Sequence, residues 1–194
     1  MVAVSARYDA VADSYASGAD RYDGSAVSTL LGLLGTSVEE RALDLACGHG
    51  LLARELARRG ATVTAIDLSG ELLQRARSHA DSAELAIDYI NGDVADPGVL
   101  EGSEFDLVVS NFGLSDIDDL DGVCQTVARV LVAGGRFAFS ILHPCFAGAP
   151  GVSGSWPADR SYYDEGWWRA DGELSVLRQQ SERTTGCCRP TSTR

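Results

Sequence analysis

From residue 41 onward, short apolar runs alternate with amphipathic stretches, and this alternation restricts the chain to a small set of folds. The apolar runs have the length of strands, and the stretches between them carry apolar residues at helical spacing. Predicted strands cover 42–46, 62–66, 85–90, 105–109 and 136–142, and predicted helices cover 51–59, 70–79 and 118–131. Strand and helix repeated at this spacing indicate an α/β fold, in which helices lie on both faces of a parallel sheet.

The remaining segments fit around one domain of 194 residues. Residues 1–40 read as helical, with Tyr8, Val11 and Tyr15 on one face, and 41–142 form the core. Residues 143–181 are rich in glycine, serine, proline and aromatic residues, which is typical of a loop or cap, and 182–194 show no apolar pattern. A length below about 250 residues favours a single hydrophobic core.

The net charge of −12 and the absence of lysine exclude several classes of site. A P-loop or a Schiff-base lysine cannot exist in this chain. Nucleic acid is disfavoured as a partner because phosphates need clustered cations. Arg54, Arg58 and Arg59 are close in sequence, but we expect them in the solvated last turn of a helix.

The chain has no apolar run long enough for a membrane span and no apolar leader, so we expect a cytoplasmic protein without a membrane partner. Its five cysteines have no disulfide framework spacing, and no His/Cys/Asp spacing suggests a metal site. Cys47, Cys124 and Cys145 lie in or beside apolar segments, which predicts buried thiols.

The turn after the first predicted strand is rich in glycine. Gly48, Gly50 and Ala53 fit a loose dinucleotide fingerprint, in which glycine lets the backbone approach a ligand and the next helix offers free N–H groups. Asp44 precedes Gly48 by four residues, and its carboxylate would repel a pyrophosphate. It suits a ligand that carries an ammonium and a sulfonium, such as S-adenosylmethionine. The alternative is an aspartate that caps the turn backbone.

The next two predicted strands are also followed by aspartates. Asp67 could accept hydrogen bonds from both ribose hydroxyls of NAD or of S-adenosylmethionine. Its alternative role as the cap of the next helix suits Ser69 better. Asp93 could accept from an adenine amine, while the backbone N–H of Val94 bonds a ring nitrogen; the alternative is an Asx-type turn.

The fourth predicted strand reads Phe-Asp-Leu-Val-Val and is followed by Ser110 and Asn111, which would flank the methionine end of the ligand. In this order and spacing, the motifs make residues 8–142 resemble the class I S-adenosylmethionine-dependent methyltransferases, of the type 11/25-like small-molecule group. The resemblance implies a Rossmann-like sheet and S-adenosylmethionine as cofactor. The cofactor contacts that it implies come from Tyr8, Tyr15, Asp44, Ala46, Gly48, Gly50, Asp67, Leu68, Asp93, Val94, Ser110 and Asn111.

We therefore expect methyl transfer to oxygen, nitrogen or carbon of a small-molecule acceptor by in-line SN2 displacement. Positioning can supply most of the catalysis, and a base is needed only if the acceptor holds its proton at neutral pH. His143 is the candidate base, with a structural histidine as the alternative. Asn111-Phe112-Gly113 differs from the Asn-Pro-Pro-aromatic motif of DNA and protein amide methyltransferases. The alternatives are a catalytically silent cofactor-binding module and an NAD-dependent oxidoreductase.

The family sheet normally ends in an antiparallel hairpin, which we expect to be missing because the chain stops at Arg194. The lack of an apolar pattern in 182–194 suggests a change of reading frame near 179–182. The alternative is a natural short tail, and sequencing the gene would distinguish the two.

Overall fold

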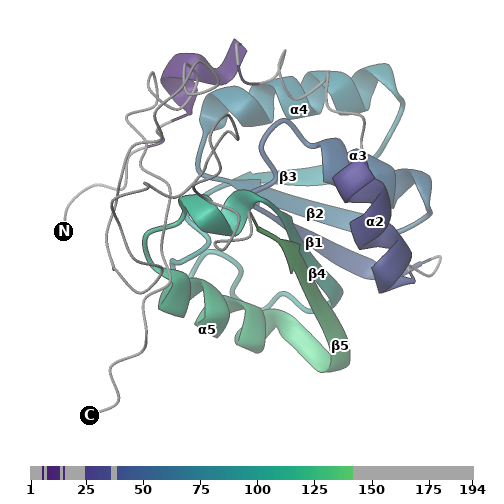
Figure 1. Cartoon of the computed structure of the whole chain (residues 1–194), viewed down its shortest axis with the longest axis vertical. Helices are drawn as coiled ribbons and strands as arrows, with labels where there is room; N and C mark the ends of the chain where they lie inside the picture. Colours follow the sequence, from purple (N-terminus) through teal and green to yellow (C-terminus); the bar gives the residue numbers. More distant parts are fainter. Residues whose placement is uncertain (1–5, 7, 14, 16–24, 36–38, 142–194) are drawn as a thin grey trace, which may run out of the picture.

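The computed structural model describes residues 6, 8–13, 15, 25–35 and 39–141. Its centre is a five-stranded sheet in the order β3-β2-β1-β4-β5, with every pair of neighbours parallel (Figure 1). The strands are β1 (Arg41–Leu45), β2 (Thr62–Asp67), β3 (Ile87–Asn91), β4 (Phe105–Asn111) and β5 (Leu131–Ser140). β2 and β3 extend the sheet on one side of β1, and the later strands β4 and β5 extend it on the other side. The carboxyl ends of β1 and β4 therefore flank the switch in strand order, where sheets of this kind bind ligands.

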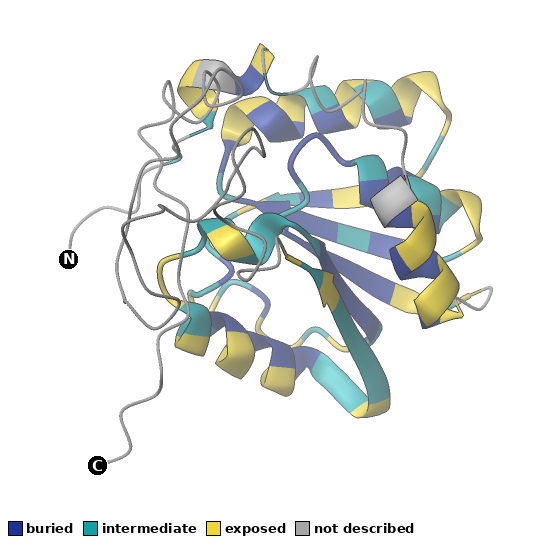
Figure 2. Ribbon diagram, viewed as in Figure 1, coloured by how far each residue is buried: buried dark blue, intermediate teal, exposed yellow. Residues whose placement is uncertain are grey.

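Helices cover both faces of the sheet, which confirms the predicted Rossmann-like architecture (Figures 1 and 2). One face packs against α2 (Ser25–Leu34), α3 (Leu51–Arg58) and α4 (Gly70–Ser82), and the other against α5 (Leu120–Val130). Alternate side chains of β1 pack into the apolar cores on the two faces of the sheet, because successive side chains of a strand point to opposite faces. Ala42 belongs to the core on the α3 side, whereas Leu43 and Leu45 belong to the core on the α5 side.

The N-terminal segment contains the short 3-10 helix η1 (Asp9–Val11) and α2, and residues 16–24 lie outside the described residues. Four apolar residues of α2 lie at helical spacing and are buried, namely Val27, Leu30, Leu31 and Leu34, whereas Leu33 on the outer side is 81% exposed. A second 3-10 helix, η2 (Gly113–Asp116), follows β4.

Two strands begin two or more residues away from the predicted position. β5 begins at Leu131 rather than at residue 136, because a bulge opposite Phe105 and Leu107 takes Gly134 and Gly135 into the strand. β3 begins at Ile87 rather than at residue 85. The N–H of Leu85 bonds the Ala80 carbonyl at 3.0 Å, and the helix end therefore holds this residue outside the sheet.

Two predictions about side-chain exposure are wrong. Arg54 is 6% exposed, not part of a solvated turn, because its guanidinium reaches back under the preceding loop. Cys124 is exposed because Val123, Val127 and Val130 form the inner face of α5 and leave it on the outer side. Cys47 is half-buried, and Cys145 lies outside the described residues.

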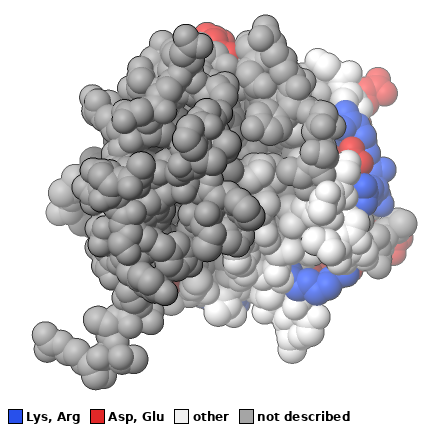
Figure 3. All heavy atoms as spheres, viewed as in Figure 1, with Lys and Arg blue, Asp and Glu red and all other residues white. Residues whose placement is uncertain are grey.

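The described surface is mixed in charge on the face shown in Figure 3, where arginine side chains form small groups beside acidic ones. None of the helices that the structure describes combines the length and the apolar character needed to cross a bilayer.

Candidate functional site

The loop between β1 and α3 is the centre of the site, and its backbone is left-handed at three positions. Ala46 has a φ of 53°, Gly48 of 56° and Gly50 of 78°. At Gly50 a Cβ atom would lie 2.7 Å from Tyr89 Oη, so only glycine fits. Among the described residues, a Cβ atom at Gly48 would meet only Tyr15 Cε1, at 3.7 Å. A ligand could therefore approach the backbone at Gly48, whereas Gly50 is fixed by the packing beneath it.

Asp44 lies in β1 just below this loop and is 1% exposed. Burial raises the pKa of this carboxyl to about 8; the backbone N–H of Ala53 in α3 lowers it, and the negative charge of Asp67 raises it further. Its Oδ2 has no hydrogen-bond partner among the described residues. The Ala53 contact favours the capping interpretation for part of the carboxyl, while Oδ2 remains as an acceptor for a cationic ligand.

Asp67 connects the end of β2 to the same loop. Its carboxylate accepts the backbone N–H of Gly48 at 2.8 Å and that of Ser69 at 2.8 Å, and the residue is 9% exposed. A carboxylate has about four lone-pair sites, so it can accept further bonds from a diol.

Ser69, not Asp67, caps α4, because its Oγ accepts the N–H of Leu72 at 3.1 Å. The half-buried Leu68 follows, with its carbonyl bound by Asn91 Nδ2 at 3.0 Å.

The turn after β3 takes the form that the sequence left open as an alternative. Asp93 Oδ1 accepts the N–H of Ala95 at 2.9 Å, which makes an Asx-type turn. Val94 is buried, and Gly92 donates its N–H to the carbonyl of Asp67 at 3.1 Å. The turn therefore lies next to the end of β2, on the side of the site away from β4.

The end of β4 lies on the other side of the glycine loop. Ser110 is fully buried, and its Oγ has no hydrogen-bond partner within the described ranges. Asn111 is half-buried, and its Oδ1 accepts a hydrogen bond from Ser140 Oγ at 2.7 Å. At Gly113 a Cβ atom would lie 2.5 Å from Ala46 Cβ, which places the turn after β4 directly against the loop after β1.

The N-terminal segment contacts both sides of this arrangement. Tyr8 donates from its hydroxyl to Asp116 Oδ2 at 2.6 Å on the β4 side. Asp9 Oδ1 accepts the Ser69 hydroxyl at 2.5 Å on the β2 side. The rings of Tyr8 and Tyr15 meet edge to face at 4.9 Å. The structure thus brings both predicted tyrosines to the strand ends.

Three side chains beneath the glycine loop were missed by the sequence analysis. His49 lies between the two glycines and is 5% exposed, with its ring 6.1 Å from that of Tyr15. Arg54 donates to the carbonyl of His49 at 2.6 Å. Tyr89 lies under Gly50, and burial raises its pKa to about 12. The position of His49 inside the Gly-x-Gly turn was a usable signal; Arg54 and Tyr89 reach the loop only through the fold.

The candidate base His143 and the predicted cap at 143–181 lie outside the described residues. Across the described part of the chain, no three His, Cys, Asp or Glu side chains are grouped closely enough to hold a metal ion. The residues that are described fit a cationic nucleoside ligand on three counts. Asp44 offers a buried acceptor atom, Gly48 an approachable backbone, and Asp67 a carboxylate at the adjoining strand end.

Comparison with known proteins agrees with this geometry. Residues 43–139 match the family described as Methyltransferase domain. The Ubiquinone biosynthesis O-methyltransferase of Klebsiella pneumoniae is 36% identical over 104 residues, which are 54% of this chain and 43% of the relative. The enzyme of the same name from Xanthomonas oryzae pv. oryzae is 38% identical over 117 residues, 60% of this chain and 47% of the relative. The chain spans about half the length of these curated relatives.

Solved structures show the same similarity. The S-adenosylmethionine-dependent methyltransferase from Mesorhizobium loti superposes with a TM-score of 0.57 at 32% identity, covering 64% of this chain and 57% of that one. The S-adenosylmethionine-dependent methyltransferase from Thiobacillus denitrificans, solved in complex with S-adenosyl-L-homocysteine, gives a TM-score of 0.50 at 27% identity, covering 58% and 46%.

Proposed function

Because this chain belongs to the family of methyltransferase domains, we propose that it transfers a methyl group from S-adenosylmethionine to a small-molecule acceptor. The observation that carries the proposal is the buried Oδ2 of Asp44, which has no hydrogen-bond partner in the described part of the chain and lies beside the glycine loop, in the β1 segment that the family match includes. The O-methyltransferase relatives and the neighbour with S-adenosyl-L-homocysteine bound support it.

We assign the polar groups at the strand ends to different parts of the donor. Asp44 and the backbone of Gly48 would hold the methionine part, and Asp67 the ribose hydroxyls. Asp93, whose Oδ1 accepts the N–H of Ala95 in the Asx-type turn, would accept from the adenine amine with its remaining lone pairs, and Val94 would donate its N–H to the ring. Tyr8 and Tyr15 would cover the donor from the N-terminal segment, as their contacts with Asp116 and His49 support. Four further residues at the same strand ends would contact the donor: Ala46, Leu68, Ser110 and Asn111. Ser110 and Asn111 would flank its methionine end.

When bound, S-adenosylmethionine supplies an electrophilic methyl group on a sulfonium. The chain's task is then mainly to orient the donor and exclude water, since a preorganised pair of reactants can provide about 7–11 kcal/mol of the barrier reduction. A cation beside Asp44 lowers the pKa of this carboxyl, so binding at neutral pH draws a proton off it. His143 remains the proposed base for acceptors that keep their proton at neutral pH.

Thermal unfolding with S-adenosyl-L-homocysteine tests the proposal, with NADH as the control ligand. Saturation at a hundred times Kd stabilises a folded protein by about 2.7 kcal/mol, which raises the melting temperature. We expect this rise with S-adenosyl-L-homocysteine and none with NADH. A cooperative transition that S-adenosyl-L-homocysteine leaves unchanged would contradict the proposal, and a rise with NADH would favour the oxidoreductase alternative.

A further inference from the structure

The turn after β4 holds a bulky residue in an unusual backbone conformation. Phe112 has a φ of 61° and a ψ of −5°, in the left-handed region. Non-glycine residues are uncommon there, and they persist only where their surroundings determine the conformation. The neighbours of Phe112 should therefore include the groups that hold it.

Ser140, the last residue of β5, supplies these groups. The N–H of Phe112 lies 3.0 Å from the carbonyl oxygen of Ser140 and 3.1 Å from its Oγ. The hydroxyl of Ser140 in turn donates to Asn111 Oδ1 at 2.7 Å. One serine thus fixes both the backbone of Phe112 and the side chain of the residue before it.

The position of this turn determines the contacts on both of its sides. Gly113 packs so tightly that a Cβ atom would lie 2.5 Å from Ala46 Cβ and 3.1 Å from Ser110 Oγ. Ala46 is itself left-handed, with a φ of 53°. Three residues beyond Gly113, Asp116 accepts the hydroxyl of Tyr8. A change of backbone at Phe112 would therefore displace the glycine loop, the end of β4 and the contact of the N-terminal segment together.

We propose that Ser140 is a positioning residue of the donor site, which holds Phe112 in its left-handed conformation and thereby sets Gly113 against the glycine loop. The inference rests on the proposed function, because the groups that Ser140 places are those assigned to the methionine end of the donor. In this role Ser140 would act on the donor through the turn that it holds.

Isothermal titration with S-adenosyl-L-homocysteine measures the effect on the full chain. Ser140→Ala removes the hydroxyl and should weaken binding about tenfold, the loss of roughly one strong hydrogen-bonded contact. Ser140→Thr keeps the hydroxyl and should bind within about twofold of the wild type. Ser140→Val matches threonine in shape without the hydroxyl, so it provides the comparison if the alanine variant folds poorly.

A second pair of substitutions separates positioning from general stability. Phe112→Gly and Phe112→Ala both remove the ring, but only glycine adopts a positive φ without strain. In a protein that carries Ser140→Ala or Ser140→Val, adding Phe112→Gly should restore the affinity for S-adenosyl-L-homocysteine. Adding Phe112→Ala instead should not restore it. Equal affinity in the two double variants would overturn the inference. So would an unchanged affinity in Ser140→Ala when the wild type binds. A wild type that binds no S-adenosyl-L-homocysteine would overturn the proposed function, and this inference with it.

Discussion

At the scale of single residues, Asp44 combines burial with an acceptor atom, Oδ2, that no other described residue uses. Its pKa rises to about 8 chiefly because burial disfavours the charged form. A group of this kind lowers the stability of the protein without ligand and gains its favourable interaction only when a cation arrives. Such a cost is common at binding sites and unusual for a residue whose role is structural.

The pH dependence of stability should therefore depend on Asp44. Between pH 3.8 and about 8 the folded state keeps a proton that the unfolded state has lost. The free energy of unfolding then falls as pH rises through this window, with a limiting slope of about 1.4 kcal/mol per pH unit. Asp44→Asn removes this term. We expect it to be more stable than the wild type at pH 7.5, with an advantage that shrinks toward pH 4.

Urea unfolding of both proteins at pH 4.5, 6 and 7.5 measures the difference. Parallel pH profiles would show that the carboxyl is ionised in the folded protein and would contradict the assignment. In a separate titration without urea, Asp44→Asn should lose affinity for S-adenosyl-L-homocysteine, because the ammonium group of this ligand loses its charged partner.

At the scale of elements, the loop between β1 and α3 is fixed by packing from α4 and β3 below it. Gly50 is the residue before α3. A Cβ atom added there would lie 2.7 Å from Tyr89 Oη and 3.0 Å from Ala76 Cβ. The loop is therefore a fixed part of the sheet edge rather than an adaptable segment.

Substitution of two glycines with the same backbone angle isolates this packing. Gly50 has a φ of 78° and Gly102 of 77°, but a Cβ atom at Gly102 would meet no described residue within 4 Å. Gly102→Ala should cost about 1–2 kcal/mol of stability, the penalty of the left-handed backbone. Gly50→Ala should cost clearly more in the same unfolding experiment, and Tyr89→Phe should recover part of the excess. Equal costs at the two glycines would show that Tyr89 does not restrict the loop.

The start of α4 connects helix capping to the N-terminal segment. Ser69 caps α4 through the N–H of Leu72 and also donates to Asp9, whereas Asp119 caps α5 through the N–H of Gly122. Ser69→Ala and Asp119→Ala should each cost about 1 kcal/mol of stability. Only Ser69→Ala should also weaken binding of S-adenosyl-L-homocysteine, as measured by titration. A similar loss of affinity in both variants would mean that capping alone is responsible.

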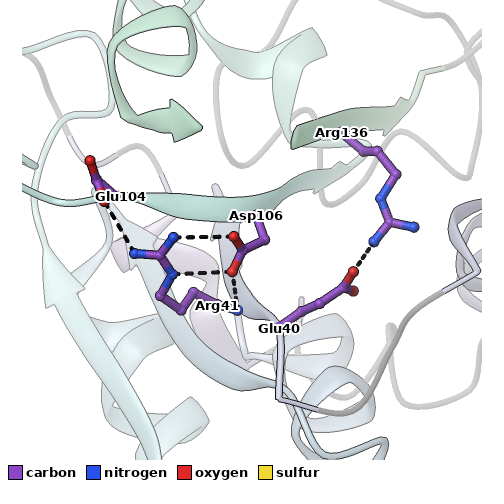
Figure 4. A network of polar contacts seen from close by, with 5 residues as sticks. All are labelled: Glu40, Arg41, Glu104, Asp106 and Arg136. Atoms are coloured by element: carbon purple, nitrogen blue, oxygen red, sulfur yellow. Dashed lines mark hydrogen bonds and ion pairs between the residues drawn. The ribbon is translucent and has the colours of Figure 1, made fainter. Parts of the chain in front are cut away.

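At the scale of the whole molecule, the two ends of the sheet carry different chemistry. The carboxyl ends hold the candidate site, while the opposite end carries surface ion pairs (Figure 4). Arg41, the first residue of β1, bonds Asp106 at 3.1 Å and Glu104 at 3.4 Å. Arg136 of β5 pairs with Glu40 and also bonds the Leu34 carbonyl at the end of α2. These pairs join β1, β4, β5 and α2 away from the site.

Removal of one of these pairs should change stability without changing ligand binding. The Arg41 guanidinium lowers the pKa of Asp106 to about 2. The stabilisation is present above the ordinary value of 3.8 and is lost as pH falls through about 2. Asp106→Asn should therefore be less stable than the wild type at pH 7, with the difference vanishing near pH 2 and decreasing in high salt.

The matched variant is Glu104→Gln, which should have a smaller effect because this partner is 70% exposed. Titration with S-adenosyl-L-homocysteine at pH 7 should give the wild-type affinity for both variants. A loss of affinity in Asp106→Asn would mean that the two ends of the sheet are coupled.

The sequence by itself predicts the sheet, its helices and the strand ends that carry the polar residues. The reason is local: alternating apolar patterns define parallel strands, and parallel strands place their carboxyl ends at one edge. Asp44, Asp67 and the glycine turn could therefore be assigned to one site before any contact was known. The same logic identified Ser69 as the cap of α4, because a cap depends only on the residues that follow it.

Only the tertiary structure decides which distant side chains support that site. Tyr8 and Asp116 are 108 residues apart, and Phe112 and Ser140 are 28 apart. Arg54 carries a charge that predicts exposure, yet the carbonyl of His49 draws it inward. The bulge in β5 likewise depends on its register with β4. Pairings of this kind follow from how strands and helices pack against one another, and no local pattern in the chain records them.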